Sequence, residues 1–143
     1  MEIDPRAARR LDLSQQQLVY RVAHETLRNA NLHARATHVW VTLTPEGSSV
    51  VLEVGDDGVG FDADQARRSP EHGHFGLQVL ADVALDAGAD LAVASAPGAG
   101  TRWVLRIPTA AQHRATERPR WLRIRSVRDA DVVASPARDE LAF

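Results

Sequence analysis

The chain is organised around Asp56-Asp57-Gly58-Val59-Gly60-Phe61, which ends an apolar run and opens a polar loop that contains two glycines. Before it, the apolar residues of 50–54 predict a buried strand. Asp56 would stand at the edge of the core, where its carboxylate can accept a hydrogen bond from an exocyclic amine such as that of adenine. Gly58 and Gly60 allow backbone conformations and close approaches that a Cβ atom forbids. The hexapeptide alone also fits an ordinary Asp/Gly turn after a strand.

Downstream of the hexapeptide, the sequence predicts a loop, a helix and a hairpin. Residues 62–74 are polar and have no regular pattern, which is typical of a mobile loop used as a lid. A helix is predicted from Gly76-Leu77 to about Gly88, with its apolar positions facing inward. The hairpin has its turn at 96–100, and its second strand is predicted to end the domain at Pro108.

Upstream, a long helix is predicted from an N-cap at Ser14, with a glutamine three residues later, to about Ala34. No Gly or Pro interrupts this stretch. Glu25, Asn29 and His33 follow one another at four-residue steps, so a regular helix would place all three on one stripe. Asn is a poor residue for a helix interior, which favours a functional role for Asn29. A solvated helix face is the alternative.

Two further strands complete the predicted elements upstream of the hexapeptide. Residues 2–4 could form a short edge strand. The alternation within 39–43 predicts a half-exposed strand, which a turn at 45–48 connects to the buried strand. The sequence therefore predicts an antiparallel hairpin that delivers Asp56 to the end of its second strand.

Composition restricts the class of protein. A length of 143 residues fits one domain, and 44% hydrophobic with 25% charged residues is typical of a soluble globular chain. The net charge of -2 gives no general case for binding nucleic acid or a membrane surface. No apolar run approaches the roughly 20 residues needed to span a bilayer, and no signal-peptide pattern is present. We therefore expect a cytoplasmic protein.

The residue types also exclude some chemistry. The chain has no cysteine, so disulfides and thiolate catalysis are excluded. All 17 basic residues other than histidine are arginine, which excludes mechanisms that need a lysine. We expect residues 1–108 to form the folded domain and 109–143, rich in Arg and Asp, to form a flexible tail that binds no nucleic acid.

Taken in order, the motifs of this chain resemble the ATP-binding catalytic domain of sensor histidine kinases, within the GHKL superfamily that also holds gyrase, Hsp90 and MutL. The motifs are 20–25 (YRVAHE, similar to the family's YRIAQE), 29–34 (similar to its N box), 56–61 (first G box), 73–77 (second G box) and 95–101 (last turn). The likeness covers about residues 13–108. It is nearest to the short-lid subfamily that partners helix-turn-helix response regulators.

The resemblance implies an α/β fold, a two-layer sandwich of the Bergerat type with a mixed sheet and helices on one face. It implies that Glu25 and Asn29 are the catalytic residues. Asn29 would be the protein ligand of Mg²⁺, which takes oxygen ligands, and Glu25 would orient a water on the metal or the reacting group. Asp56 would accept from the adenine amine, with Thr101 supporting it through its hydroxyl or a water.

The resemblance also implies contacts to the rest of ATP. The start of the helix at Gly76-Leu77 would offer free N–H groups and partial positive charge to the phosphates. Gly58 and Gly60 would let the backbone reach the nucleotide. His33 and His74 are further candidate contacts to the nucleotide. The alternatives are a packed helix residue for His33 and a solvated loop residue for His74.

Three departures from the family pattern put the catalytic rate in doubt, one of them in the helix after the second G box, where 78–82 read QVLAD and the family usually has a Met-Arg-rich start. Leu32 stands where the family usually carries a lysine, and Arg28 stands where a second asparagine is common. Few residues precede the long helix, so we do not expect the helix pair with the phospho-accepting histidine to be within this chain. The chain would be either an excised catalytic domain or a stand-alone ATP-binding protein.

The expected function is therefore binding of ATP with Mg²⁺ as the phosphoryl donor of a two-component sensor histidine kinase. The expected partners are the dimerisation and phosphotransfer helices, and indirectly a response regulator, with the chain itself a monomer in isolation. One alternative is a serine kinase of the anti-sigma-factor type, whose partner would be a small anti-anti-sigma protein. The other is a non-catalytic ATP-binding interaction module.

Overall fold

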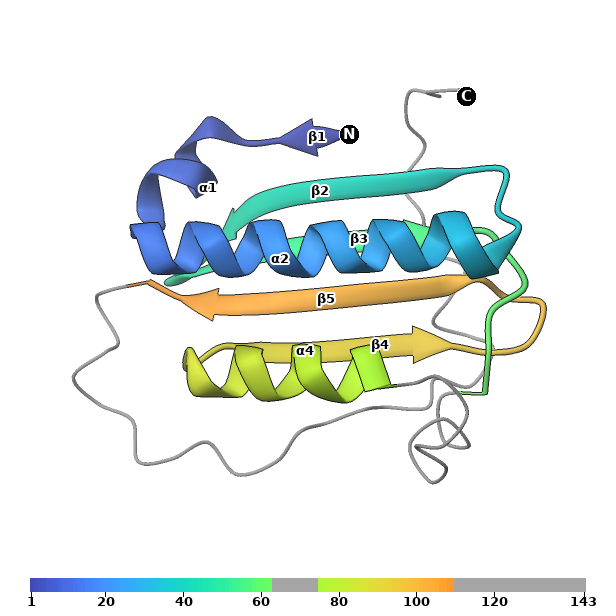
Figure 1. Ribbon diagram of the computed structural model, residues 1–143. Coiled ribbons are helices and arrows are strands. Elements are labelled where there is room, and N and C mark those ends of the chain that lie inside the picture. Colours follow the sequence, from blue (N-terminus) through green and yellow to red (C-terminus); the bar gives the residue numbers. More distant parts are fainter. Residues whose placement is uncertain (63–74, 110–143) are drawn as a thin grey trace.

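The computed structural model describes residues 1–62 and 75–109, and these form one five-stranded sheet with helices packed on it (Figure 1). The strands lie in the order β1-β2-β3-β5-β4. The elements in chain order are β1 (Glu2–Ile3), α1 (Pro5–Arg10), α2 (Leu13–Asn29), η1 (Ala30–Ala34), β2 (Val39–Glu46), β3 (Ser49–Asp56), α4 (Phe75–Asp86), β4 (Asp90–Ser95) and β5 (Thr101–Pro108).

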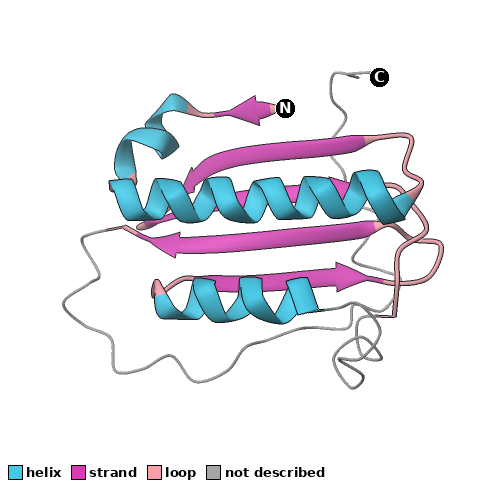
Figure 2. Ribbon diagram, viewed as in Figure 1, coloured by secondary structure: helices cyan, strands magenta, loops and turns pink. Residues whose placement is uncertain are grey.

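The sheet is mixed, because β1 pairs with β2 in parallel and every other pair of neighbours is antiparallel. Both long helices lie on the same face of the sheet (Figure 2). Helix α2 packs against β3 and β5, and α4 packs against β4. The predicted two-layer α/β architecture with helices on one face is confirmed.

The core lies between the sheet and the two long helices. Alternate residues of β3 and β5 are buried, as expected for strands with one covered face. Each fully buried aliphatic side chain contributes about 1.5–3 kcal/mol relative to an exposed one. The core residues on these four elements include Leu18 and Val22 of α2, Val50, Leu52 and Val54 of β3, Leu80 and Ala84 of α4, and Trp103, Leu105 and Ile107 of β5.

The long helix begins earlier than the sequence predicted, because its N-cap is Asp12 and not Ser14. The Asp12 carboxylate accepts the Gln15 N–H at 2.8 Å, and the Gln15 side chain accepts the Asp12 N–H at 3.1 Å. This is a capping box, in which aspartate serves as well as serine. Ser14 instead donates its hydroxyl to Asp12 at 2.7 Å.

A short helix and a tighter turn also differ from the prediction. Helix α1 lies between β1 and α2, where the sequence analysis predicted no helix, and it starts with Pro5 directly after the N-cap Asp4. Strand β2 continues to Glu46, so Pro45 pairs with Val50 inside the hairpin and only residues 47–48 form the turn. Strand β1 ends before it reaches this part of β2, which leaves an open edge where proline is tolerated.

Strand β5 ends at Pro108. Residues 110–143 and the predicted lid within 63–74 lie outside the described residues, so the division into a domain and a tail stays a prediction. Within the described ranges, no helix has both the length and the apolar character needed to cross a membrane.

Candidate functional site

Several connections meet at one end of the sheet, where β3 and β4 finish and β2 and β5 begin (Figure 1). The end of η1 and the start of α4 lie at the same end (Figure 1). The hexapeptide 56–61 leaves β3 here and touches the chain on both sides. Its Val59 N–H donates to the Ala34 carbonyl at 2.7 Å, and its Val59 carbonyl accepts from the Gly98 N–H at 2.7 Å.

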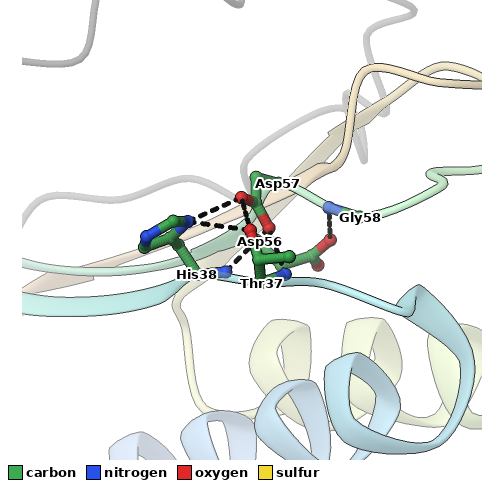
Figure 3. Close-up of polar contacts among 5 residues, drawn as sticks. All are labelled: Thr37, His38, Asp56, Asp57 and Gly58. Carbon is green, nitrogen blue, oxygen red and sulfur yellow. Dashed lines mark hydrogen bonds and ion pairs between the residues drawn. The ribbon is translucent and has the colours of Figure 1, made fainter. Parts of the chain in front are cut away.

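Asp56 is buried at the end of β3, opposite Thr101 in the ladder with β5, and only 6% of it is exposed. Its Oδ1 accepts the Gly58 N–H at 2.9 Å (Figure 3). Burial raises the pKa of Asp56 above its ordinary value, and the hydrogen bonds from the Gly58 and Thr101 backbone act in the opposite direction. A desolvated carboxylate of this kind is stabilised by a further donor, so the site favours a ligand that carries an N–H group.

Ser95 links the hexapeptide to the start of β5, and the sequence reading gave it no role. Its hydroxyl donates to the Gly100 carbonyl and accepts the Phe61 N–H, both at 2.9 Å. It also lies 3.1 Å from the Thr101 hydroxyl. Ser95 is buried, and its sequence context shows only a serine two residues before a Pro-Gly turn, which does not indicate these contacts. The support that Thr101 was expected to give Asp56 stays a prediction.

The two glycines of the hexapeptide accommodate the protein's own backbone. A Cβ atom on Gly58 would lie 2.2 Å from the Ala34 carbonyl oxygen. Gly60 has a φ of +60°, and a Cβ atom there would lie 2.1 Å from the Ala96 carbonyl oxygen. These contacts give a structural reason for both glycines. Their expected approach to a nucleotide stays a prediction.

Glu25 and Asn29 lie along the last turns of α2. Glu25 is 28% exposed, and its Oε1 accepts from the Arg28 guanidinium at 3.0 Å. Arg28, which the sequence singled out only as a departure from the family pattern, therefore pairs with the predicted catalytic acid. Asn29 is half-buried, and its side chain makes no capping hydrogen bond. Its amide oxygen is free to act as the ligand that the sequence predicted.

The helix predicted to carry Glu25, Asn29 and His33 is α-helical only as far as Asn29. Residues Ala30–Ala34 form a π-turn, in which hydrogen bonds span five residues instead of four. His33 is exposed, and the buried residue at the end of the turn is Ala34. A pattern read with an α-helical period does not reveal a π-turn, so the change in hydrogen bonding was not predicted, and the shared stripe of Glu25, Asn29 and His33 stays a prediction. The proposed contact of His33 with phosphate stays a prediction.

Asp57 faces away from Asp56 and binds the connection between η1 and β2 (Figure 3). Its Oδ1 accepts the Thr37 and His38 N–H groups, both at 2.8 Å. Its Oδ2 accepts the Thr37 hydroxyl at 2.7 Å and lies 2.9 Å from His38 Nδ1. Burial acts to raise the pKa of Asp57, but these hydrogen bonds outweigh it and hold the pKa well below its usual range. Asp57 belongs to the hexapeptide 56–61, but its sequence context predicted no role for it.

The remaining predicted contacts are only partly within the described residues. His74 lies outside them. Gly76 and Leu77 belong to the first turn of α4, as predicted, and only their backbone is described. The first N–H groups of a helix have no partner within it, so this turn can receive an anion.

A metal ion would find few protein ligands here. Residues 1–62 and 75–109 contain no group of three or more His, Cys, Asp or Glu side chains that could hold one. Mg²⁺ commonly keeps several waters and binds few protein oxygens together with substrate phosphates. The single amide oxygen of Asn29 fits a metal of that kind and does not fit a closed protein site.

The family model for histidine kinase-, DNA gyrase B- and HSP90-like ATPases matches residues 14–111, which is more than half of the chain. The chain belongs to this family. The predicted resemblance to the ATP-binding domain of sensor histidine kinases is thus confirmed. The pairing with helix-turn-helix response regulators stays a prediction.

Relatives of this ATPase family that resemble the chain include sensor proteins. An uncharacterized sensor-like histidine kinase of Chloroflexus aurantiacus is 34% identical over 92 residues, which are 63% of this chain and 15% of the relative. The sensor protein VraS of Staphylococcus aureus is 29% identical over 90 residues, which are 63% of this chain and 25% of VraS. The chain therefore spans a quarter or less of the length of these relatives.

Solved structures agree with the assignment to the ATPase family. The histidine kinase domain of the blue-light activated kinase EL346 of Erythrobacter litoralis superposes with a TM-score of 0.55 at 25% identity, over 71% of this chain and 48% of that one. The histidine kinase AdeS of Acinetobacter baumannii gives a TM-score of 0.56 at 14% identity, over 67% of this chain and 48% of that one, which supports the fold alone.

Proposed function

We propose that the chain binds ATP together with Mg²⁺ and acts as the phosphoryl-donor domain of a two-component sensor histidine kinase. The phosphoryl group would go to a histidine on a separate dimerisation helix pair. Membership of the histidine kinase-like ATPase family supports binding of ATP. Similarity to longer proteins, a sensor-like histidine kinase and a sensor protein of which the matched segment is a quarter or less, supports a role as one module of such a kinase.

The buried carboxylate of Asp56 is the observation that carries the proposal. One of its oxygens already accepts the Gly58 N–H, and burial disfavours its charged form. The exocyclic amine of adenine would supply a further donor to the carboxylate, whereas guanine presents an oxygen at that position and would leave two acceptors facing each other. The proposal therefore predicts selectivity for ATP over GTP.

The phosphates and the metal would bind nearer to the helices. Asn29 offers an amide oxygen to Mg²⁺, and the first turn of α4 offers backbone N–H groups to phosphate. The metal would neutralise negative charge on the phosphates. Glu25 lies one turn before Asn29 and would orient a water or the accepting group. Catalysis of this kind consists mainly of positioning and charge stabilisation.

Titration of the unmutated chain with ATP and with GTP tests the adenine assignment. We expect GTP to bind about 10- to 100-fold more weakly, the size of one lost hydrogen bond to a charged group plus an unpaired acceptor. Equal affinities for the two nucleotides would contradict the role of Asp56.

The metal assignment is tested separately with Asn29→Ala. Its affinity for ATP should fall in the presence of Mg²⁺ and change little in EDTA, because the lost oxygen is a ligand of the metal. An equal loss of affinity for ATP with and without the metal would mean that Asn29 has only a packing role in the helix.

The kinase assignment is tested with labelled ATP and Mg²⁺. The chain alone should bind nucleotide and acquire no phosphohistidine, because His24 and His33 lie on the helix proposed to hold the nucleotide and cannot swing in line with its terminal phosphate. Adding a helix pair with a phospho-accepting histidine should give acid-labile, base-stable label on that added protein. Such label on the chain by itself would contradict the expectation.

A non-catalytic ATP-binding module is the second candidate, and the ion pair between Arg28 and Glu25 favours it. An arginine that holds the carboxylate reduces its capacity to orient a water or to accept a proton. If the pair restrains catalysis, Arg28→Ala should raise the rate of transfer to an added helix pair and leave the affinity for ATP nearly unchanged. A rate that stays undetectable in both forms would favour the non-catalytic module.

A further inference from the structure

The connection that follows η1, residues 35–38, is held against the hexapeptide at several points. The Val59 N–H donates to the Ala34 carbonyl at 2.7 Å, and the Asp57 N–H donates to the His38 carbonyl at 3.2 Å. The remaining bonds all come from one side chain, because the Asp57 carboxylate binds both the backbone and the side chains of Thr37 and His38 (Figure 3).

This connection needs to be held, because it contains a strained residue. Arg35 has a φ of +50°, the left-handed region that non-glycine residues avoid. A residue of this kind keeps its conformation only where the surrounding structure determines it. The hydrogen bonds that Asp57 accepts lie two and three residues after Arg35, and they fix the direction in which the chain leaves η1.

The two sides of the proposed nucleotide site come from the two segments that Asp57 joins. Asp56 belongs to the hexapeptide, and Asn29 belongs to the helix that continues through η1 into the connection. Both Asp57 oxygens are used by the protein, so this carboxylate is set up to hold structure and not to contact a ligand. Its lowered pKa keeps it charged, and therefore an acceptor, throughout the neutral range.

We propose that Asp57 is a positioning residue whose carboxylate holds residues 35–38, and through them the α2–η1 helix with Asn29, in register with Asp56. The proposal rests on the proposed function, because it assigns the adenine end of ATP to Asp56 and the metal end to Asn29. It implies that substituting Asp57 lowers the affinity for a ligand that contacts both Asp56 and Asn29 more than the affinity for a ligand that contacts only one of them.

The test compares two ligands, ATP with Mg²⁺ and adenosine, on the unmutated chain and on Asp57→Asn. The amide keeps the size of the side chain but loses its charge and one acceptor oxygen. Affinity for ATP with Mg²⁺ should fall roughly 10-fold, as expected when a charge-assisted hydrogen bond is lost. Affinity for adenosine should stay within about twofold, since Asp56 keeps its hydrogen bond from the Gly58 N–H and only the repulsion from the neighbouring charge is removed.

Three variants make the comparison specific. Asp56→Ala should lower the affinity for both ligands. Asp90→Asn removes an exposed carboxylate at the other end of β4 and should lower the affinity for neither. In the Asn29→Ala background, Asp57→Asn should cause little further loss, because the group that it positions is absent. Circular dichroism of each variant at the assay temperature confirms that the fold is kept. If Asp57→Asn does not fold, Thr37→Val removes one donor and should give the same pattern at about fivefold.

The outcomes separate this proposal from the proposed function. Equal losses for ATP with Mg²⁺ and for adenosine would show that Asp57 supports only the fold of the loop and would overturn the proposal, as would no loss for either. The proposal would also be overturned if Asp57→Asn caused the same loss of affinity for ATP with Mg²⁺ in the Asn29→Ala background as in the unmutated chain. If the unmutated chain binds neither ligand, the proposed function itself fails.

Discussion

Asp56 and Asp57 are neighbours in the chain, yet they occupy opposite kinds of surroundings. Asp56 is 6% exposed, and its carboxylate accepts the Gly58 N–H. The side chain of Asp57 is 38% exposed, and its carboxylate binds Thr37 and His38 through both oxygens. Burial raises the pKa of Asp56, and hydrogen bonds hold the pKa of Asp57 down.

The difference shows how one strand end can serve a ligand and the fold at once. Successive side chains of an extended chain point to opposite sides, so two adjacent carboxylates separate without any special geometry. The one on the covered side loses water, and under the proposed function it would gain a donor from the adenine of ATP. The one on the open side is paired by the protein itself and holds the connection between η1 and β2 against the end of β3.

Displacing the loop after β3 would disturb the surroundings of both aspartates. Gly60→Ala should displace it and should have the largest effect on stability of the substitutions considered. The substitution places a Cβ at a φ of +60° and 2.1 Å from the Ala96 carbonyl oxygen. We expect a loss of about 2–4 kcal/mol in the free energy of unfolding, measured with urea. Gly98→Ala is the matched control, because its φ is +79° and nothing lies within 4 Å, so only the conformational part should remain. Equal losses would mean that the close contact is unimportant.

Asp56→Ala removes the buried member of the pair. The affinity for ATP should fall by about 1.5–3 kcal/mol, because the acceptor for the adenine amine is lost. The weaker affinity for GTP should change little, which isothermal titration of both nucleotides would measure. A fall of the same size for GTP would indicate that the substitution disturbs the site as a whole.

Asp57→Asn removes the paired member, and its effect on stability should depend on pH. Because the pKa of Asp57 is lowered from 3.8 in the folded chain, its contribution is present above that value and is lost as the pH falls through the folded pKa. We expect the free energy of unfolding of the unmutated chain to be about 1 kcal/mol higher than that of the variant at pH 7, a value that allows for solvent screening. This difference should shrink below about pH 4. The raised pKa of Asp56 has the opposite effect on the free energy of unfolding. The contribution of Asp56 is lost as the pH rises above 3.8. A difference independent of pH would contradict the role of the Asp57 charge.

His38→Ala should change the least. The His38 ring lies 2.9 Å from Asp57 but is 54% exposed, and its backbone N–H remains available to the carboxylate after the substitution. Exposed pairs of this kind contribute about 0–1 kcal/mol, so urea unfolding and ATP affinity should both stay close to those of the unmutated chain. A large loss would show that the imidazole, and not the backbone, is the main partner of Asp57.

The sequence predicted the parts of this molecule that depend on local pattern. An apolar run located β3 and alternating apolar residues located β2, and the glycines located the turns between strands. The ordered motifs identified the family, whose model matches residues 14–111. Asp56 was found because it ends a buried strand and is followed by two glycines.

The parts that were missed depend on contacts between residues far apart in the chain. Nothing around Asp57 in the sequence indicates that Thr37 and His38 will meet its carboxylate, because the pairing of β2 with β3 brings them together. Ser95 likewise acquires its role only when β4 and β5 meet. The π-turn was missed for another reason, since a short apolar pattern does not distinguish one helical period from another.

The π-turn also has a consequence for how chain length can vary in this family. A turn closed over five residues holds one residue more than an α-helical turn. A related chain with one residue fewer between Asn29 and Arg35 could therefore cross the same gap as ordinary α-helix. Leu32 is 56% exposed, so the surplus residue can be removed or added on the solvent side without opening the core. An alignment gap at this point is thus compatible with an identical site, and length alone is no guide to whether a relative has kept it.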